Sequence, residues 1–298
     1  MSEMLAAARV SVGMPVYNGG QYLRSALESA LSQSFRDIEL IISDNASTDN
    51  TESICREYAA KDARIKYVRQ SVNIGPYANF KFVLDEAKGE YFIWAACDDV
   101  RSNNFIEVNL NFLKEHPDYV ASTSPNGFEG IELAKQTWVN FKLDGDRFER
   151  ITEFFKYSWV SHGIFYSLIR ADVLRSCPLL GQSFIAADWG IDLYLASYGK
   201  INRTTAGYTI FGIKGVSSSA DAYKAFRNHW IERFVPFYRL SQYVYSLSKD
   251  FNQFEKSHLV FIMAKLNIKA HADQVWACVY PVYVRYVRPI VRKKLMLK

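Results

Sequence analysis

The stretch Val10-Ser-Val-Gly-Met-Pro-Val-Tyr-Asn18 joins an apolar run to a polar turn, and similar apolar runs follow it at regular intervals. Short apolar runs bounded by turn residues are typical of buried strands. The predicted strands are Val10 to Met14, Ile38 to Ser43, Ile65 to Arg69 and Tyr91 to Ala95, and helical patterns separate them at Tyr22 to Leu31, Thr51 to Ala60 and Tyr77 to Ala87. This alternation predicts an α/β fold with a mostly parallel sheet that helices cover on both faces.

The later sequence is less regular, and its helical patterns dominate beyond residue 220. We expect, in order, a helix at Asn103 to His116, a strand at Tyr119 to Thr123, a long irregular loop from Ser124 to Arg150, a helix near Thr152 to Tyr157, a strand near Ile164 to Ile169, a helix at Asp188 to Tyr198, short strands from Ile201 to Ile213, and helices at Tyr223 to Leu247 and Asn252 to Ala272. The prediction is therefore a domain of residues 1–218 and a helical, basic extension of residues 219–298.

The composition fits an ordinary folded chain, with 298 residues of which 49% are hydrophobic and 22% charged. The four cysteines, Cys55, Cys97, Cys177 and Cys278, have no paired spacing, so we expect reduced thiols in a cytoplasmic protein. Six of the 36 basic residues follow Asp273 and none of the 31 acidic residues does, which leaves the rest of the chain nearly neutral. A neutral body without a recognition motif argues against nucleic-acid binding.

The basic C-terminal tail also contains aromatic residues, among them Trp276, Tyr280 and Tyr283. Basic and aromatic residues together are typical of a segment that lies on an anionic membrane surface. The uncharged stretch from Val275 to Val284 has ten residues, whereas a spanning helix needs about 20. Met1 to Ala8 contains Glu3 and does not resemble a secretory signal. We expect a cytoplasmic protein that binds the inner face of the plasma membrane peripherally, through its C-terminal helices.

Polar residues follow three of the predicted strands, as Pro15-Val-Tyr-Asn18, Asp44-Asn-Ala-Ser-Thr-Asp49 and Cys97-Asp-Asp99. Ligands of open parallel sheets bind beyond the carboxyl ends of the strands, so these residues should converge on one cleft. The glycine-rich phosphate-binding motifs are absent from the sequence. The adjacent carboxylates Asp98 and Asp99 fit a site for Mg²⁺ or Mn²⁺. They fit a solvated loop or a helix N-terminus equally well.

Four sequence blocks resemble those of family-2 glycosyltransferases of the GT-A fold. The blocks are Val10-Ser-Val-Gly-Met-Pro-Val-Tyr-Asn18, Ile42-Ser-Asp-Asn-Ala-Ser-Thr-Asp49, Asn73-Ile-Gly75 with Asn79, and Gly89-Glu-Tyr-Phe-Ile93 followed by Asp98-Asp99. The resemblance is close over about the first 125 residues and looser to about residue 215. It implies an inverting, metal-assisted transfer of a sugar from a nucleoside diphosphate sugar, in proteins of the bacterial surface-polysaccharide or O-antigen type.

The resemblance also implies roles for single residues. Pro15, Tyr17 and Asp44 would hold the nucleobase, Asp98 the ribose or metal, and Asp99 the metal and diphosphate. Asn18, Asn73 and Asn79 belong to the same nucleotide-binding blocks. The sequence has Ala96 where the family often has a further Asp. As alternatives, Tyr17 could be a packing aromatic at a strand end, and Asp44 could cap a turn.

An inverting displacement needs a base that takes the proton of the acceptor hydroxyl, and a carboxylate is the usual one. By the same resemblance Asp188 occupies the position of the base, although Ala187 replaces the Glu that often precedes it. Asp188 could instead be a simple N-cap, and Asp192, one turn later, is its rival. Trp189 could stack on a sugar or pack in the interior. His162 could contact the diphosphate or the acceptor, or be structural.

The leading hypothesis is thus a glycosyltransferase that uses a nucleoside diphosphate sugar and a glycan or lipid-linked acceptor. A nucleotidyltransferase that makes the activated sugar is an alternative, although such enzymes usually carry a glycine-rich basic loop where this chain has Tyr17-Asn-Gly-Gly20. A second alternative is a non-catalytic protein that binds a sugar nucleotide or a glycan, which Ala96 and Ala187 favour and which Asp99 and Asp188 oppose.

Overall fold

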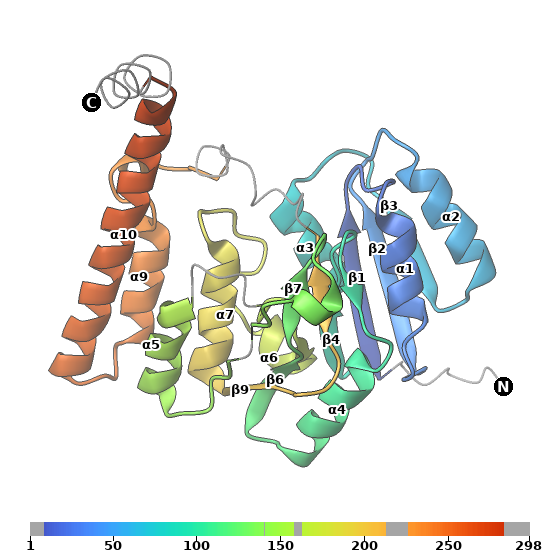
Figure 1. The fold of residues 1–298 in the computed structure, drawn as a ribbon, viewed down its shortest axis with the longest axis horizontal. Helices are drawn as coiled ribbons and strands as arrows, with labels where there is room; N and C mark the ends of the chain where they lie inside the picture. Colours follow the sequence, from blue (N-terminus) through green and yellow to red (C-terminus); the bar gives the residue numbers. More distant parts are fainter. Residues whose placement is uncertain (1–8, 140, 158–162, 213–225, 283–298) are drawn as a thin grey trace, which may run out of the picture. The chain divides into compact units, whose positions relative to one another are not determined.

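A computed structural model describes residues 9–139, 141–157, 163–212 and 226–282, with side chains up to residue 277 (Figure 1). The chain forms two compact units. The first unit comprises residues 1–182 and 188–215, and the second comprises residues 183–187 and 216–298. The predicted boundary between residues 218 and 219 lies outside the described residues and stays a prediction.

A seven-stranded sheet in the order β3-β2-β1-β4-β8-β6-β9 forms the centre of the first unit. Its strands are β1 (Val10–Val16), β2 (Ile38–Asp44), β3 (Ile65–Arg69), β4 (Tyr91–Trp94), β6 (Tyr119–Thr123), β8 (Leu168–Arg170) and β9 (Lys200–Arg203). Neighbouring strands run parallel except that β8 is antiparallel to both β4 and β6. The predicted α/β fold with a mostly parallel sheet is confirmed.

Helices cover both faces of this sheet, as its alternating side chains require. The helices of the first unit are α1 (Leu23–Leu31), α2 (Thr51–Lys61), α3 (Pro76–Asp85), α4 (Phe105–Glu115), α5 (Arg147–Tyr157), α6 (Ala171–Arg175) and α7 (Ala187–Tyr198). Residues of α1, α2 and α4 share one buried cluster with Val12 and Ile42. On the other face, Val83 of α3 and Phe92 of β4 close over Gly13, which has no side chain to keep them apart.

A second, three-stranded sheet in the order β5-β10-β7 is built from β5 (Val100–Arg101), β10 (Thr209–Phe211) and β7 (Asn126–Phe128). The prediction of an irregular loop over residues 124–150 is therefore wrong in part, because it contains β7, the 3₁₀ helix η1 (Leu133–Lys135) and the start of α5. The strand that pairs with β7 is β10, which lies far away in the sequence, so local periodicity gives no sign of β7.

The strand predicted near Ile164 to Ile169 begins only at Leu168. The residues before it form turns, in which Gly163 adopts a left-handed backbone conformation and its carbonyl oxygen accepts a hydrogen bond from Tyr166 N–H. Such a conformation is cheap for glycine and costly for other residues. The chain therefore turns sharply before it enters the sheet at β8.

The second unit is helical, with η3 (Trp230–Arg233), α9 (Tyr238–Leu247) and α10 (Gln253–Val282). The predicted helix Tyr223 to Leu247 is too long, because Pro236 cannot continue a helix and α9 begins after it. The predicted helix Asn252 to Ala272 extends ten residues further. Asn267 of α10 bonds α9 through Ser241 and accepts from Phe237 N–H. Over the described residues, no helix has both the length and the apolar character needed to cross a bilayer.

The close packing around Gly13 generates a stability prediction. A Cβ at this position would lie 2.6 Å from Phe92 Cζ and 2.7 Å from Val83 Cγ2. We expect Gly13→Ala to lower the free energy of unfolding by about 1–3 kcal/mol, the usual cost of overpacking a core. Urea unfolding measures the change, with the exposed Glu115→Ala on α4 as control. An unaltered midpoint for Gly13→Ala would contradict the packing described here.

Candidate active site

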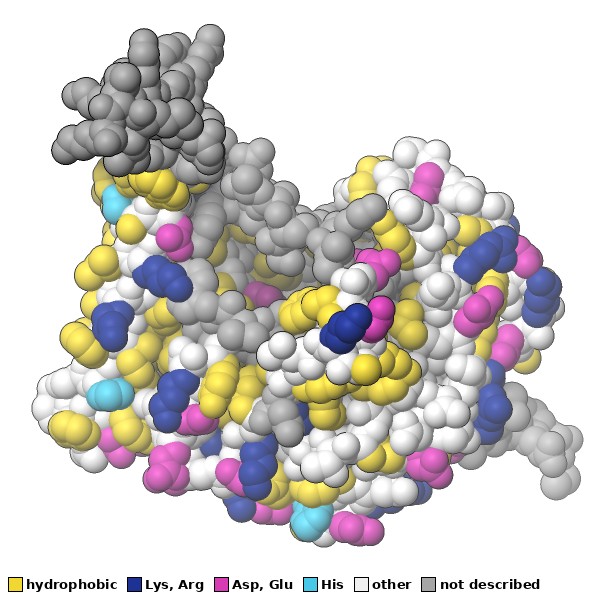
Figure 2. Space-filling model, in the orientation of Figure 1, with side chains coloured by type: hydrophobic (Ala, Val, Ile, Leu, Met, Phe, Trp, Pro, Cys, Tyr) yellow, Lys and Arg dark blue, Asp and Glu magenta, His cyan; other side chains and the backbone are white. Residues whose placement is uncertain are grey.

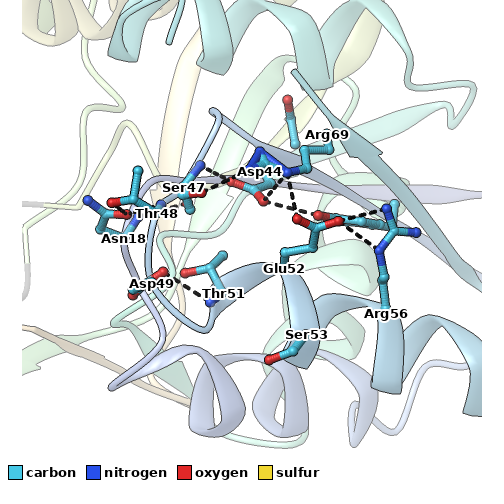
Figure 3. A network of polar contacts seen from close by, with 12 residues as sticks. Asn18, Asp44, Ser47, Thr48, Asp49, Thr51, Glu52, Ser53, Arg56 and Arg69 are labelled. Carbon is cyan, nitrogen blue, oxygen red and sulfur yellow. Dashed lines mark hydrogen bonds and ion pairs between the residues drawn. The ribbon is translucent and has the colours of Figure 1, made fainter. Parts of the chain in front are cut away.

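The loops that follow β1 and β2 hold each other in place (Figure 3). Asn18 Oδ1 accepts a hydrogen bond from Thr48 N–H at 2.8 Å, and Asn18 N–H donates to Ser47 Oγ at 2.9 Å. Gly20 N–H donates to Asp49 Oδ2 at 3.0 Å. The polar residues predicted at these two strand ends are thus brought together, and hydrogen bonds fix their loops before any ligand binds.

Asp44 lies at the end of β2, fully buried. Its Oδ1 accepts from Ser47 N–H at 2.8 Å, which is the contact that the turn-capping alternative requires, and its Oδ2 accepts from Tyr67 Oη at 3.0 Å. Arg69 Nε lies 4.0 Å from Asp44 Oδ2 and 2.7 Å from Glu52 Oε2 (Figure 3). Burial and the carboxylate of Asp44 raise the pKa of Tyr67 well above its usual range, so its hydroxyl remains a hydrogen-bond donor.

The other residues predicted to bind a nucleotide differ in their accessibility. Tyr17 is 50% exposed at the end of β1, whereas Pro15 is buried within the strand. Asn73 Oδ1 accepts from Asn45 Nδ2 at 2.9 Å. Asn79 is buried and bonds Ser43 through both its oxygen and its nitrogen, which ties α3 to β2. Tyr17 is therefore open to a ligand. The hydrogen bonds of Asn79 instead hold α3 against β2.

Asp98 and Asp99 follow β4 at the same edge of the sheet. Asp99 is 5% exposed, its Oδ1 accepts from Gly212 N–H at 3.2 Å, and its Oδ2 is buried with no hydrogen-bond partner among the described residues. Burial raises the pKa of Asp99 to about 7, with Arg101 opposing the shift and Asp98 adding to it. Asp98 is half-buried, and burial, together with the charge of Glu129, raises its pKa too.

Gly212, directly after β10, completes the surroundings of both carboxylates. Besides its hydrogen bond to Asp99, its Cα lies so close to Asp98 that a Cβ would be 2.4 Å from Asp98 Oδ2 and 2.7 Å from its Cγ. A residue with a side chain would displace the Asp98 carboxyl group. This role could not be predicted from local sequence, because Gly212 lies more than a hundred residues from either aspartate.

Tyr166 connects this carboxylate pair to the predicted base. Because β8 runs antiparallel to β4, the residues that enter β8 lie where β4 ends, and the rings of Phe165 and Trp94 stack there at 4.3 Å. Burial raises the pKa of Tyr166 well above its usual range, and the charges of Asp99, Asp188 and Asp98 add to the shift. Tyr166 is thus within electrostatic reach of all three carboxylates. Sequence reasoning missed it.

Asp188 lies in the first turn of α7, exposed to solvent. Protein atoms packed around its carboxyl group nevertheless raise its pKa, although hydrogen bonds from the backbone of Trp189 and of Asp188 itself oppose the shift. Ala186, two residues earlier, has a left-handed backbone with φ of 63°, a strained conformation for alanine. The rival Asp192 is 1% exposed, and burial raises its pKa well above its usual range. Of the two, only Asp188 is open to an acceptor.

The two remaining candidates for acceptor binding are Trp189 and His162, and only Trp189 lies within the described residues. Trp189 packs edge to face against Phe154, with 6.3 Å between the ring centroids, so the packing alternative for Trp189 has a defined partner. His162 lies outside the described residues, and its contact with diphosphate or acceptor stays a prediction.

The residues after β4 fit a divalent cation. Asp99 offers a buried carboxylate oxygen to which no described residue donates a hydrogen bond, and Asp98 lies beside it. Carboxylate oxygens are the ligands that Mg²⁺ and Mn²⁺ prefer. The described part of the chain holds no group of three or more His, Cys, Asp or Glu residues that could bind a metal. Mg²⁺ usually takes one or two protein carboxylates and completes its shell with water and phosphate oxygens. Two ligands therefore suffice.

The α/β fold, with a mostly parallel sheet flanked by helices, is that of glycosyltransferases of the GT-A type, and comparison with solved structures agrees on the fold. Staphylococcus aureus TarS 1–349 in complex with UDP-GlcNAc has a TM-score of 0.59 at 18% identity, covering 94% of this chain and 76% of TarS 1–349. The mannosyltransferase PcManGT of Pyrobaculum calidifontis, in complex with GDP-Man and Mn²⁺, has a TM-score of 0.54 at 14% identity, covering 95% and 88%.

The family model of glycosyl transferase family 2 matches residues 11–175, more than half of the chain, and the protein belongs to this family. An uncharacterized glycosyltransferase of Haemophilus influenzae is 37% identical over 150 residues, 48% of this chain and 60% of the relative. Glycosyltransferase GlyG of Streptococcus pneumoniae is 36% identical over 115 residues, 39% of this chain and 36% of the relative. The chain thus spans only part of these curated relatives. The family predicted from the four sequence blocks is confirmed.

The contact between Gly212 and Asp98 generates a prediction about metal binding. We expect Gly212→Ala to weaken Mn²⁺ binding by about 10–100-fold, as other changes behind metal ligands do, because the new Cβ displaces the carboxyl group. Isothermal titration calorimetry measures the affinity, and thermal melting shows whether the fold is intact. The same substitution in an Asp98→Ala background should have little further effect. Equal Mn²⁺ affinity of Gly212→Ala and the unaltered protein would refute the role of this glycine.

Proposed function

We propose that the protein transfers a sugar, with inversion, from a nucleoside diphosphate sugar to a hydroxyl of a glycan or lipid-linked acceptor. Two observations carry the proposal: Asp98 and the buried Asp99 lie side by side after β4, and Asp188 lies exposed in the first turn of α7. A displacement needs one group at the leaving diphosphate and another at the attacking hydroxyl, and these carboxylates provide both. The UDP-GlcNAc and GDP-Man in the TarS and PcManGT complexes support a nucleotide sugar as donor.

The donor nucleotide would bind at the ends of β1 and β2. Tyr17 presents an exposed ring on which a base can stack, and the bonds between Asn18 and Thr48 fix the loop that carries it. Asp44 would support the nucleotide-binding loop indirectly, because both of its carboxylate oxygens already accept hydrogen bonds from neighbouring residues. A site whose loops are ordered in advance loses less conformational entropy when it binds.

Asp98 and Asp99 would hold the divalent metal, Mn²⁺ or Mg²⁺. When bound, such an ion offsets the negative charge that develops on the leaving diphosphate. The Asp99 carboxylate is buried, and within the described part of the chain one of its oxygens accepts no hydrogen bond, so this oxygen is available to the ion. Because its pKa is raised, Tyr166 keeps its proton, and its hydroxyl can donate a hydrogen bond to an anionic group of the substrate.

Asp188 would remove the proton from the attacking hydroxyl. A carboxylate with a raised pKa is a stronger base than an ordinary one, and Asp188 is also open to solvent, where an acceptor can reach it. The new glycosidic bond forms as the bond to the diphosphate breaks on the opposite face of the anomeric carbon. That arrangement inverts the configuration of the sugar.

The acceptor class implies a location. We propose that the C-terminal helices and the basic tail hold the protein on the inner face of the plasma membrane, where a lipid-linked acceptor is found. The six basic residues after Asp273 would contact anionic headgroups.

Replacement of the base provides the test of the function. We expect Asp188→Asn to lower the rate of transfer by a factor of about 10²–10⁴, the usual contribution of a general base, because an amide cannot accept the acceptor proton. Thermal shifts with UDP-GlcNAc and Mn²⁺ should remain as in the unaltered protein. Asp172→Asn, an exposed aspartate in the first turn of α6, is the matched control and should retain activity. Normal transfer by Asp188→Asn would sink the assignment of the base.

The raised pKa of Asp188 also predicts how the rate depends on pH. The base must be ionised, so kcat/KM should fall tenfold for each unit of pH below its pKa. Because that pKa is raised, we expect the acid limb to lie above the ordinary value for aspartate, about 3.9. A rate profile with a saturating metal concentration measures it. An acid limb at or below the ordinary value would contradict the environment described for Asp188.

A further inference from the structure

The helix α10 has two apolar sides. Leu259, Met263, Leu266 and Ala270 are buried, and their spacing of three and four residues places them on one side of the helix, toward α9. A second set of apolar residues recurs every seven residues and lies on the opposite side. These residues, which we call the outer stripe, are between 49% and 76% exposed: Phe254, Phe261, Ile268 and Val275.

Charged residues of α10 lie at different angles from the outer stripe. Lys265 is about 50° from the line of the stripe at 100° per residue, and its Nζ is 5.4 Å from the centroid of the Phe261 ring. Lys269 and Glu255 are both about 100° away from this line, and Asp273 is about 150° away. Figure 2 shows hydrophobic side chains together with Lys, His and acidic side chains over the helix coloured orange to red in Figure 1. The line of the outer stripe itself is apolar, and the charged residue beside it is Lys265.

The apolar stripe and the lysine beside it favour an anionic membrane over a second copy of the chain as the surface that covers the stripe. A second copy of the chain would bring lysines of one helix toward those of the other, which costs energy. An anionic membrane attracts the same lysines and accepts Phe, Ile and Val side chains at the boundary between headgroups and acyl chains. The basic residues that follow in the sequence add to this attraction and would add to the repulsion between two copies.

We propose that the outer stripe of α10 inserts into the interfacial region of an anionic membrane, with the helix parallel to the surface. From Phe254 to Val275 the stripe is about 32 Å long at 1.5 Å per residue, so it would contact lipid along most of the helix. This inference deepens the proposed membrane association. It adds an apolar contact, defined by four residues, that is separate from the charge of the tail.

The test replaces the stripe without altering the tail. The variant carries Phe254→Ser, Phe261→Ser, Ile268→Ser and Val275→Ser in the full chain. We expect its binding to vesicles of phosphatidylcholine and phosphatidylglycerol to weaken at least about tenfold, because four apolar side chains no longer enter the membrane. Leucine at the same four positions should preserve binding. Ala272→Ser with Ala277→Ser, also exposed on α10, controls for added serine, and circular dichroism shows that the helices are intact.

Salt separates the two contacts, since it screens the charge of the tail and leaves apolar insertion in place. A chain that ends at residue 282 should lose the salt-sensitive part of binding, and the serine variant the part that persists in high salt. Two results would overturn the proposal. One is equal vesicle binding by the serine variant and the unaltered protein. The other is an unaltered protein that is a dimer in light scattering and a serine variant that is a monomer, because the stripe would then bind a second copy. Mn²⁺-dependent hydrolysis of UDP-GlcNAc in solution tests the proposed activity separately, because it needs no membrane.

Discussion

The burial of the Asp99 carboxylate, away from water, is the physical constraint on which the candidate site depends. One of its oxygens receives a single backbone hydrogen bond from Gly212, and the other receives none among the described residues. Burial disfavours the charged form of a carboxylate, which is why the pKa of Asp99 rises to about 7. Arg101 opposes the shift only in part, and Asp98 adds to it. The local structure therefore favours a cation at this edge of the sheet.

Much of the fold could be predicted because each central strand is a continuous apolar run that is visible in the local sequence. β1 to β4 are apolar runs between turns, and buried strands of a parallel sheet need little else. The failures among the strands have two causes. β5 and β7, of two and three residues, acquire a strand conformation only by pairing with the distant β10, and β8 is shortened by the turn at Gly163. β10 itself falls within the short strands predicted from Ile201 to Ile213. Long-range pairing leaves no periodicity in a short segment.

The candidate site divides in the same way. Asp44, Asp98, Asp99 and Asp188 could be found from sequence because each follows a strand or begins a helix, within a family whose blocks are well marked. Tyr166 and Gly212 could not. Tyr166 reaches the site because β8 is reversed in the sheet, and Gly212 matters for the side chain that it lacks. Neither property belongs to a local pattern, and both depend on tertiary contacts of the finished fold.

The reversal of β8 has an evolutionary consequence. In a purely parallel sheet only the segments that leave strands reach the ligand edge, and each must also lead back to the opposite edge. Because β8 is reversed, the segment that leads into this strand also reaches the ligand edge, and it need not return to the opposite edge. Insertions or exchanges in the approach to β8 can thus diversify what the enzyme accepts while the register of the sheet is inherited intact.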